Sequence, residues 1–149
     1  MALKEQLAED LKTALKAGDE RRKSAIRMAT AAVRNAEIAA GAPLDDAGVI
    51  SVLTKEVRQR RESIEEFKKG NRPDLVQKEE EELAFLLAYM PQQLSREEIV
   101  SAAKEVIAQV GARGPADKGK VMPVIIERLR GRADGREINQ VVTELLAQG

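Results

Sequence analysis

The chain has 149 residues, 43% hydrophobic and 34% charged, so it is long and apolar enough to bury a core. Its 25 basic and 25 acidic residues balance, which excludes attraction of the whole molecule to nucleic acid or to an anionic membrane. Without cysteine and histidine, disulfides, thiol nucleophiles and serine–histidine catalysis are excluded. Aromatic residues make up only 2%, and an aliphatic, Ala-, Glu-, Lys- and Arg-rich composition favours helices packed on helices.

Two helices are predicted at the start of the chain. Leucine recurs at every fourth position between residues 3 and 15, which predicts a helix that ends at Gly18. Asp19 is suited to cap a second amphipathic helix, and Gly41 closes it. The short link between them predicts a helical hairpin.

Two further helices are predicted before residue 91. A proline-containing break follows the second helix, and a third begins at a cap provided by Asp45 or Asp46 and ends near Gly70. Pro73 suits the first position of a fourth helix. Pro91 interrupts the helical pattern that follows.

The C-terminal part predicts a fifth and a last helix with clear boundaries. Ser95 and Glu98 have the spacing of a capping box ahead of a helix that ends at Gly111. Asp134 caps a helix that continues towards the C-terminus.

The segment between these two helices is ambiguous. Six apolar residues in a row, 121–126, fit a buried strand or a helix. Pro123 disfavours a central strand, and it disfavours a straight helix unless it lies in the first turn. Because no second strand is predicted to pair with this one, we expect a short helix that is kinked or starts late.

The predicted fold is all-α, with an N-terminal helical hairpin bundle of about four helices and a small C-terminal three-helix domain. We place the domains at residues 1–92 and 93–149. The first residues are charged and amphipathic without an apolar core, and no stretch reaches the roughly 18 apolar residues of a membrane span. A cytoplasmic location, no membrane partner, no metal and no cofactor are expected.

One stretch resembles a phosphate-binding loop. Residues 114–121, GPADKGKV, match the pattern G-x-x-x-x-G-K-[ST] except at Val121, where a hydroxyl should bind Mg²⁺. Pro115 removes a backbone N–H, and the preceding segment predicts a helix rather than a strand. Nucleotide binding is therefore rejected, although Lys118 and Lys120 at a helix N-terminus could hold a phosphate weakly.

A second signal is a local excess of basic residues. Residues 118–136 contain six basic and two acidic residues, a balance of +4 in a neutral chain. Arginine offers planar donors that match phosphate oxygens, so this cluster is the candidate nucleic-acid-binding site. The alternative is an ordinary turn whose arginines favour a helix C-terminus. The candidate residues are Lys118, Lys120, Arg128, Arg130, Arg132 and Arg136.

Other charged residues have a structural explanation. Six basic residues between Arg58 and Arg72 precede the acidic run Glu79–Glu82 across the predicted turn, and pairing within that hairpin is expected. Such surface pairs stabilise little. Phe67, Phe85 and Tyr89 are too few for a base-stacking surface.

Several motifs together resemble the YqeY family. They are IRM at 26–28, EVRQRRESIEEFKKGNRPDLVQKEEEEL at 56–83, PQQLSREEI at 91–99, GKVMP at 119–123 and GRADGREIN at 131–139. The most specific matching positions are Gly119, Lys120, Gly131, Arg132, Ala133, Asp134, Gly135 and Asn139. The resemblance implies a small C-terminal helical domain similar to the tail of the B subunit of the tRNA-dependent glutamyl/aspartyl amidotransferase. There the tail contacts tRNA, while the chemistry lies in other domains and subunits.

Three functions follow as hypotheses. The first is a non-catalytic module that binds tRNA or serves the amidotransferase or translation machinery as an accessory. The second is a protein-interaction adaptor that uses the N-terminal hairpins. The third, a glutamine-dependent carbon–nitrogen ligase, rests on family association alone, because no nucleophile and base can be named. No independent catalytic activity is expected.

Overall fold

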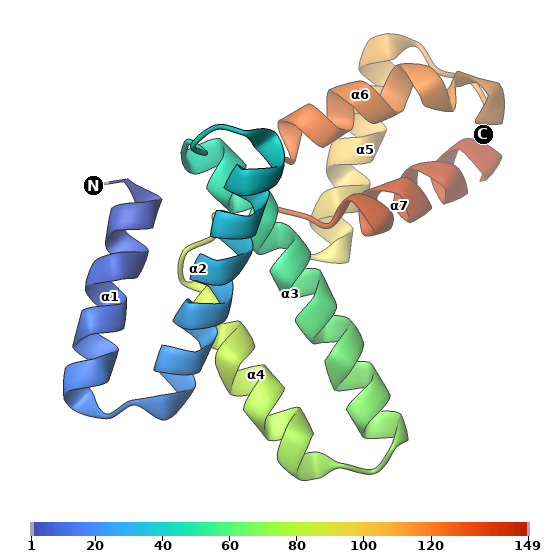
Figure 1. The fold of residues 1–149 in the computed structure, drawn as a ribbon. Helices are drawn as coiled ribbons and strands as arrows, with labels where there is room; N and C mark the ends of the chain where they lie inside the picture. Colours follow the sequence, from blue (N-terminus) through green and yellow to red (C-terminus); the bar gives the residue numbers. More distant parts are fainter. Residues whose placement is uncertain (1, 149) are drawn as a thin grey trace. The chain divides into compact units, whose positions relative to one another are not determined.

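The structure, a computed structural model, describes residues 2–148 and contains, over this range, seven α-helices, one short 3₁₀ helix and no strand (Figure 1). The predicted all-α class is therefore confirmed. The chain divides into two compact units, which are separated in the sequence between Met90 and Pro91. We call them unit 1 and unit 2.

Unit 1 consists of two helical hairpins (Figure 1). Its helices are α1 (Leu3–Ala17), α2 (Glu20–Ala40), α3 (Asp46–Lys69) and α4 (Pro73–Leu87). Helix α1 packs on α2 and α3 on α4, and α2 also contacts both helices of the second hairpin. This central position makes α2 the helix that joins the two hairpins.

Local capping explains where these helices begin and end. Asp19 accepts a hydrogen bond from the backbone N–H of Arg22, and Asp45 accepts one from Gly48. Gly18 and Gly41 end α1 and α2 with φ of 68°, a left-handed conformation that costs glycine least. The predicted boundaries of the first two helices are thereby confirmed, and Asp45 is the cap of α3.

Aliphatic side chains form the apolar core of unit 1, and a hydrogen-bonded tyrosine packs against this core. The buried apolar cluster comprises Leu7, Ile26, Ala29, Val33, Val49, Leu53, Val57 and Leu86. Tyr89, which follows α4, packs against this cluster and donates its hydroxyl to Asp10 of α1. Burial and this bond raise the pKa of Tyr89, so the phenol stays neutral and keeps the bond.

Unit 2 is a three-helix unit with its own core. Helices α5 (Arg96–Val110), α6 (Lys118–Arg128) and α7 (Gly135–Gln148) each contact the other two, and the 3₁₀ helix η1 (Pro115–Asp117) precedes α6. The capping box predicted at Ser95 and Glu98 is present at the start of α5. The buried cluster comprises Ile99, Ala103, Val106, Val121, Ile125, Leu129, Ala133, Ile138, Val141, Val142 and Leu146.

Helix α6 settles the ambiguous apolar segment. It is a helix, as expected, but it begins at Lys118, five residues before Pro123, and so it does not start late. Proline at this position removes only the bond that would reach the carbonyl of Gly119. Val121 and Ile125 are fully buried, and their burial offsets that loss.

Candidate functional site

The six cationic residues predicted to bind nucleic acid separate into two groups along α6. Lys118 and Lys120 lie in its first turn, and the arginines lie at or beyond its last turn. At about 1.5 Å per residue, the ten steps from residue 118 to residue 128 span about 15 Å. Four of the six thus lie within residues 128–136, from the end of α6 to the start of α7, a segment that we call the arginine turn. Its members are Arg128, Arg130, Arg132 and Arg136.

Two of these arginines hold exposed partners. Arg128 donates to Glu105 and to Gln109 of α5, both at 3.1 Å. Arg130 donates to Glu127, three residues earlier, at 2.8 Å. These guanidinium side chains are 39% and 55% exposed. Exposed pairs of this kind contribute about 0–1 kcal/mol, so a phosphate can replace the carboxylate at little cost.

The other two arginines each make a hydrogen bond in which a backbone atom takes part. Arg132 Nε donates to the carbonyl oxygen of Gln92 at 3.3 Å. The backbone N–H of Arg136 donates to Asp134 at 2.9 Å, which is the N-cap bond of α7 expected from the sequence. The first bond holds the side chain of Arg132, and the second fixes the main chain at Arg136.

Hydrogen bonds connect the arginine turn to residues 91–94, the loop that precedes α5. The N–H of Leu94 donates to the carbonyl of Arg132 at 2.9 Å, and the Gln93 side chain donates to the carbonyls of Gly131 and Pro91, each at 2.8 Å. Gly131 is buried and has φ of 76°, a conformation that strains any residue with a Cβ. Two of the motifs noted in the sequence, at 91–99 and 131–139, therefore have a structural role in their first residues.

The lysine end of α6 contains its own carboxylate. Asp117 accepts the backbone N–H of Arg113 at 2.9 Å and lies 3.6 Å from the ammonium of Lys120. The bond from Arg113, more than the nearby Lys120, holds the pKa of Asp117 below its usual value. Lys118 has no ion-pair partner within residues 2–148. Asp117 thus places a negative charge beside Lys120, which opposes the binding of a phosphate at this end of α6.

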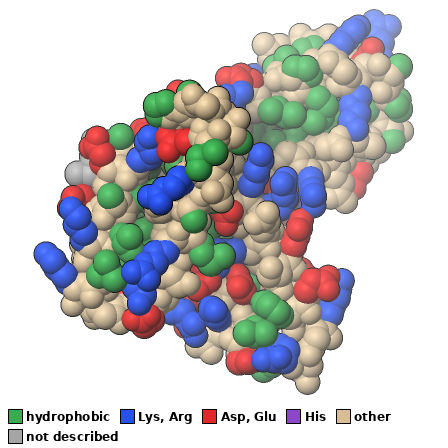
Figure 2. All heavy atoms as spheres, in the orientation of Figure 1, with side chains coloured by type: hydrophobic (Ala, Val, Ile, Leu, Met, Phe, Trp, Pro, Cys, Tyr) green, Lys and Arg blue, Asp and Glu red, His purple; other side chains and the backbone are tan. Residues whose placement is uncertain are grey.

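The visible surface carries no large patch of one charge. Figure 2 shows basic and acidic side chains intermixed over the visible face of unit 1. Unit 2 contains nine basic and eight acidic residues, a net charge of +1 from the sequence of residues 91–149. Unit 2 as a whole therefore has too little net charge to attract a polyanion, and its basic residues are in local excess at the arginine turn.

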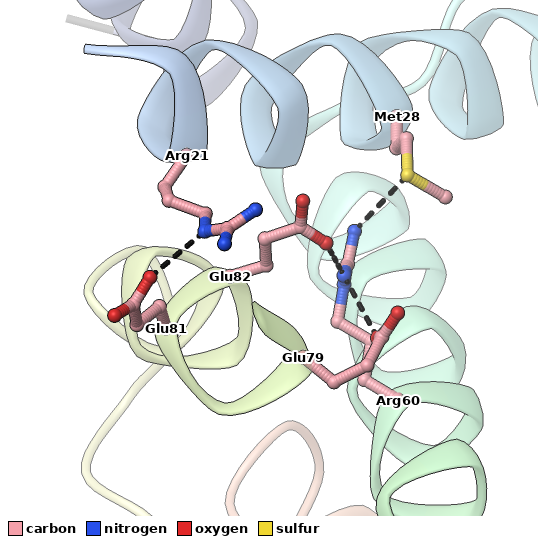
Figure 3. Close-up of polar contacts among 6 residues, drawn as sticks. All are labelled: Arg21, Met28, Arg60, Glu79, Glu81 and Glu82. Carbon is pink, nitrogen blue, oxygen red and sulfur yellow. Dashed lines mark hydrogen bonds and ion pairs between the residues drawn. The ribbon is translucent and has the colours of Figure 1, made fainter. Parts of the chain in front are cut away.

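Unit 1 contains a buried ion cluster in place of part of the predicted surface pairing. Arg60 of α3 is 4% exposed and donates to Glu79, at 3.1 Å, and to Glu82, which is 1% exposed. Its Nη2 also contacts Met28 Sδ of α2 at 3.2 Å (Figure 3). Burial raises the pKa of the neighbouring Glu56, while Arg60 opposes that rise. The cluster therefore links α2, α3 and α4.

Other charges of this hairpin pair elsewhere. Arg21 of α2 donates to Glu81 at 2.9 Å, and Arg72 pairs with Asp74 (Figure 3 shows the first pair). The sequence correctly suggested pairing between Arg58–Arg72 and Glu79–Glu82 but described it as superficial. The spacing of residues along α3 could have predicted that Arg60 is buried. Arg60 falls between the core positions Val57 and Ile64 of α3.

The first hairpin carries an apolar groove that the sequence analysis did not anticipate. It has a volume of about 430 Å³ between α1 and α2, and Leu7, Leu11, Leu15 and Val33 contribute to its lining. Leu15 is 48% exposed. The rim carries three cations and one carboxylate: Lys4, Lys12, Arg34 and Glu37.

The spacing of the leucines in α1 explains the groove. A helix turns by about 100° per residue, so a step of four residues advances the side chain by about 40°. Three such steps, from Leu3 to Leu15, rotate it by about 120°, more than one packing face covers. Leu7 is buried and Leu15 is left accessible. This drift was readable in the sequence.

Two functional possibilities find no support in the described range. Within residues 2–148 no helix is both long and apolar enough to cross a membrane. The same residues contain no group of three acidic side chains placed to hold a metal ion.

Relatives of the chain include proteins named "Altered inheritance of mitochondria protein 41, mitochondrial". The protein of Eremothecium gossypii is 45% identical over 85 residues, covering 56% of this chain and 46% of that protein. That of Lachancea thermotolerans is 42% identical over 87 residues, covering 58% and 46%. That of Saccharomyces cerevisiae (strain YJM789) is 42% identical over 84 residues, covering 56% and 45%. The match thus spans less than half the length of these relatives.

These names correct the expected location. The sequence predicted a cytoplasmic protein, and that prediction is wrong, because the relatives are named as mitochondrial proteins and point to the mitochondrion. The prediction rested on a search for an apolar leader, which is the mark of secretory signals alone. Mitochondrial targeting segments are amphipathic and basic, so they have no apolar leader to detect.

A family comparison covers almost the whole chain. The family model described as "Yqey-like protein" matches residues 4–146. This range includes the ion cluster of unit 1, the arginine turn and the loop of residues 91–94 that is hydrogen-bonded to it. The resemblance seen in the motifs is therefore confirmed, and the chain belongs to the YqeY family.

Proposed function

We propose that the protein is a non-catalytic module that contacts the phosphate backbone of folded RNA, such as tRNA, through the arginine turn. The observation that carries this proposal is the placement of four arginines within residues 128–136, around a backbone turn that hydrogen bonds hold in place. Arginine binds phosphate in planar, two-pronged contacts, and a fixed turn loses little entropy on binding.

The contact is with phosphate rather than with bases. Phe67, Phe85 and Tyr89 are the only aromatic residues of the chain, and all three are partly buried in unit 1. Without stacking surfaces, recognition follows the shape and backbone of a structured RNA. Binding is then modest and strongly salt-dependent. An accessory role beside a tRNA-dependent amidotransferase or the translation machinery fits such a module.

The role of the lysine end is subordinate. Lys120 already pairs with Asp117, and about 15 Å of helix separates this end from the arginine turn. Of the six residues predicted from the sequence, we assign the phosphate contacts to Arg128, Arg130, Arg132 and Arg136, while Lys118 and Lys120 add only long-range attraction.

Filter binding with bulk tRNA at two or more salt concentrations tests the proposal. The variant Arg130→Glu/Arg136→Glu should weaken binding and lower the slope of log K against log salt by about two, one for each lost contact. The matched control, Lys104→Glu/Arg113→Glu, changes the net charge of unit 2 by the same amount away from the turn. Absence of binding by the unaltered protein at low salt, or equal loss in both variants, contradicts the proposal.

A second function, an adaptor for protein partners, is favoured by the α1–α2 groove. An apolar floor between two helices accepts a third helix, which completes a three-helix packing. On the rim Lys4 pairs with Glu37 at 2.7 Å, so the excess positive charge comes from Lys12 and Arg34. The occupant is therefore an amphipathic helix whose apolar stripe is flanked by acidic residues.

Peptide anisotropy distinguishes this adaptor from the RNA module. A leucine-striped helical peptide with glutamate flanks should bind several-fold more tightly than the same peptide with lysine flanks. Leu15→Asp should abolish that binding, whereas Ile38→Asp, at a residue 73% exposed outside the groove, should not. Equal binding of the two peptides overturns the adaptor and leaves the RNA proposal untouched.

A further inference from the structure

The contact between Met28 and Arg60 joins an accessible sulfur-bearing residue to a buried cation. Met28 of α2 is 51% exposed, whereas Arg60 of α3 is 4% exposed. The Sδ–Nη2 distance is 3.2 Å, and Figure 3 shows the thioether lying over the end of the guanidinium. A reagent in solution can therefore reach a residue that touches the interior ion cluster.

The guanidinium of Arg60 is unevenly satisfied. Its Nη1 donates to both Glu79 and Glu82. Its Nε is buried without any partner, and within residues 2–148 the only acceptor of Nη2 is the Met28 sulfur. A thioether is a weak acceptor, so the outer side of a buried cation is left with poor hydrogen bonding.

Oxidation of Met28 supplies the acceptor that is missing. We propose that Met28 is a modification site for hydrogen peroxide, and that the resulting sulfoxide oxygen accepts a hydrogen bond from Arg60 Nη2. The sulfur gives up an electron pair to form the S–O bond, the O–O bond of the peroxide breaks, and the other oxygen leaves as water. A reductase that draws electrons from a dithiol reverses the change.

The consequence is the opposite of ordinary methionine damage. A sulfoxide in an apolar core disrupts packing, because it places a polar group where none can be satisfied. At Met28 the new oxygen is partly exposed and meets a charged donor, and bonds to charged groups are the stronger ones. Oxidation therefore tightens the contact between α2 and α3 and makes unit 1 more stable.

Met90 and Met122 provide internal comparisons. Both are partly buried and pack against the cores of unit 1 and unit 2 respectively. Neither makes a hydrogen bond to a guanidinium within the described range. Their sulfoxides should follow the usual, destabilising pattern.

The test uses the full chain treated with dilute hydrogen peroxide. Peptide mass spectrometry should find sulfoxide at Met28 several-fold faster than at Met90 or Met122. At the point where Met28 alone is oxidised, Tm of unit 1 should rise by about 4–8 °C, the shift expected for one hydrogen bond in a domain of this length. The same treatment of Met28→Leu should give no rise.

A mimic separates the hydrogen bond from other effects of peroxide. Met28→Gln places an amide oxygen near the position of the sulfoxide oxygen and should be at least as stable as Met28→Leu, despite its lower hydrophobicity. A fall in Tm on oxidation of Met28, or a glutamine variant clearly less stable than the leucine variant, overturns the proposal. So does oxidation of Met28 no faster than that of Met90 and Met122.

Discussion

Arg60 and the arginine turn use the same guanidinium group in opposite ways. Arg60 is buried among Glu79, Glu82 and Met28, and its charge is committed to holding α2, α3 and α4 together. Arg130 is 55% exposed, and within residues 2–148 its only acidic partner is Glu127, three residues earlier in the last turn of α6. One arginine is part of the structure, and the other is available to a ligand.

Pairing alone therefore does not decide whether a cation is free to bind a ligand. Arg128 and Arg130 both have carboxylate partners, yet water surrounds these pairs and weakens them. Removing water makes a pair costly to break, because the partner is left as an uncompensated buried charge. Four variants, ordered by expected effect, test this distinction.

Loss of the buried partner should have the largest effect. Glu82→Ala leaves Arg60 without its closest carboxylate and should lower the free energy of unfolding of unit 1 by about 3–5 kcal/mol. Urea denaturation followed by circular dichroism measures the change. Glu81→Ala, which removes exposed bonds to Arg21 and Gln77, is the matched control and should cost less than about 1 kcal/mol. Similar costs for both would show that burial does not distinguish the two pairs.

Backbone geometry, rather than ion pairing, should set the stability of the arginine turn. Gly131→Ala forces a Cβ onto a residue with φ of 76° and should destabilise unit 2 by about 1–2 kcal/mol. Gly119→Ala is the control, since a Cβ there meets no atom within 4 Å and a helical alanine is favoured by about 0.5–1 kcal/mol. Thermal unfolding measures both, and a neutral Gly131→Ala would mean that the turn relaxes without strain.

The start of α5 should give a pH-dependent effect. The Ser95 N–H donates to Glu98, and this bond, with that from the Ser95 hydroxyl, lowers the pKa of the Glu98 carboxyl. A lowered pKa gives stability that is present above the unfolded value, about 4.3 for Glu, and is lost as pH falls through the folded value. The Tm difference between the unaltered protein and Glu98→Ala should thus be greatest at neutral pH and shrink below about pH 4.

Glu97→Ala serves as the control for this titration, because Glu97 lies in the same first turn but makes no bond to Ser95. A Tm difference for Glu98→Ala that stays constant down to pH 3 would contradict the capping explanation.

The smallest effect is expected for the exposed partner of Arg130. Glu127→Ala should change the stability of unit 2 by less than about 0.5 kcal/mol, as is usual for exposed ion pairs. The same change frees the guanidinium and should strengthen tRNA binding rather than weaken it. Filter binding measures this, and weaker binding would indicate that Glu127 positions Arg130 productively.

Local features of the fold were predictable because their causes lie within a few residues. Asp19 and Ser95 mark the starts of helices and Gly18 marks the end of one, through bonds to the adjacent turn. In the structure these helices begin and end at the predicted positions. Pro123 was harder, because a proline inside a helix is tolerated only when burial of its neighbours compensates. That compensation depends on the other helices of unit 2.

The site was less predictable because it depends on contacts between distant residues. Clustering in the sequence suggested one group of six cations, but the length of α6 separates the lysines from the arginines. Nothing local showed that Gln92 would accept a bond from Arg132, 40 positions later. The burial of Arg60 with Glu82 similarly required α3 and α4 to face each other at those positions.

The bonds between residues 91–94 and the arginine turn also bear on how this protein can be divided. A C-terminal fragment that begins at Ser95 retains α5, α6 and α7 but lacks Gln93 and Leu94, the donors to the carbonyls of Gly131 and Arg132. Such a fragment keeps its apolar core, but its arginine turn loses the hydrogen bonds that hold the backbone in place. A fragment that begins at Pro91 keeps every one of these bonds, so the few residues ahead of the first helix govern whether the isolated piece reports on the natural loop.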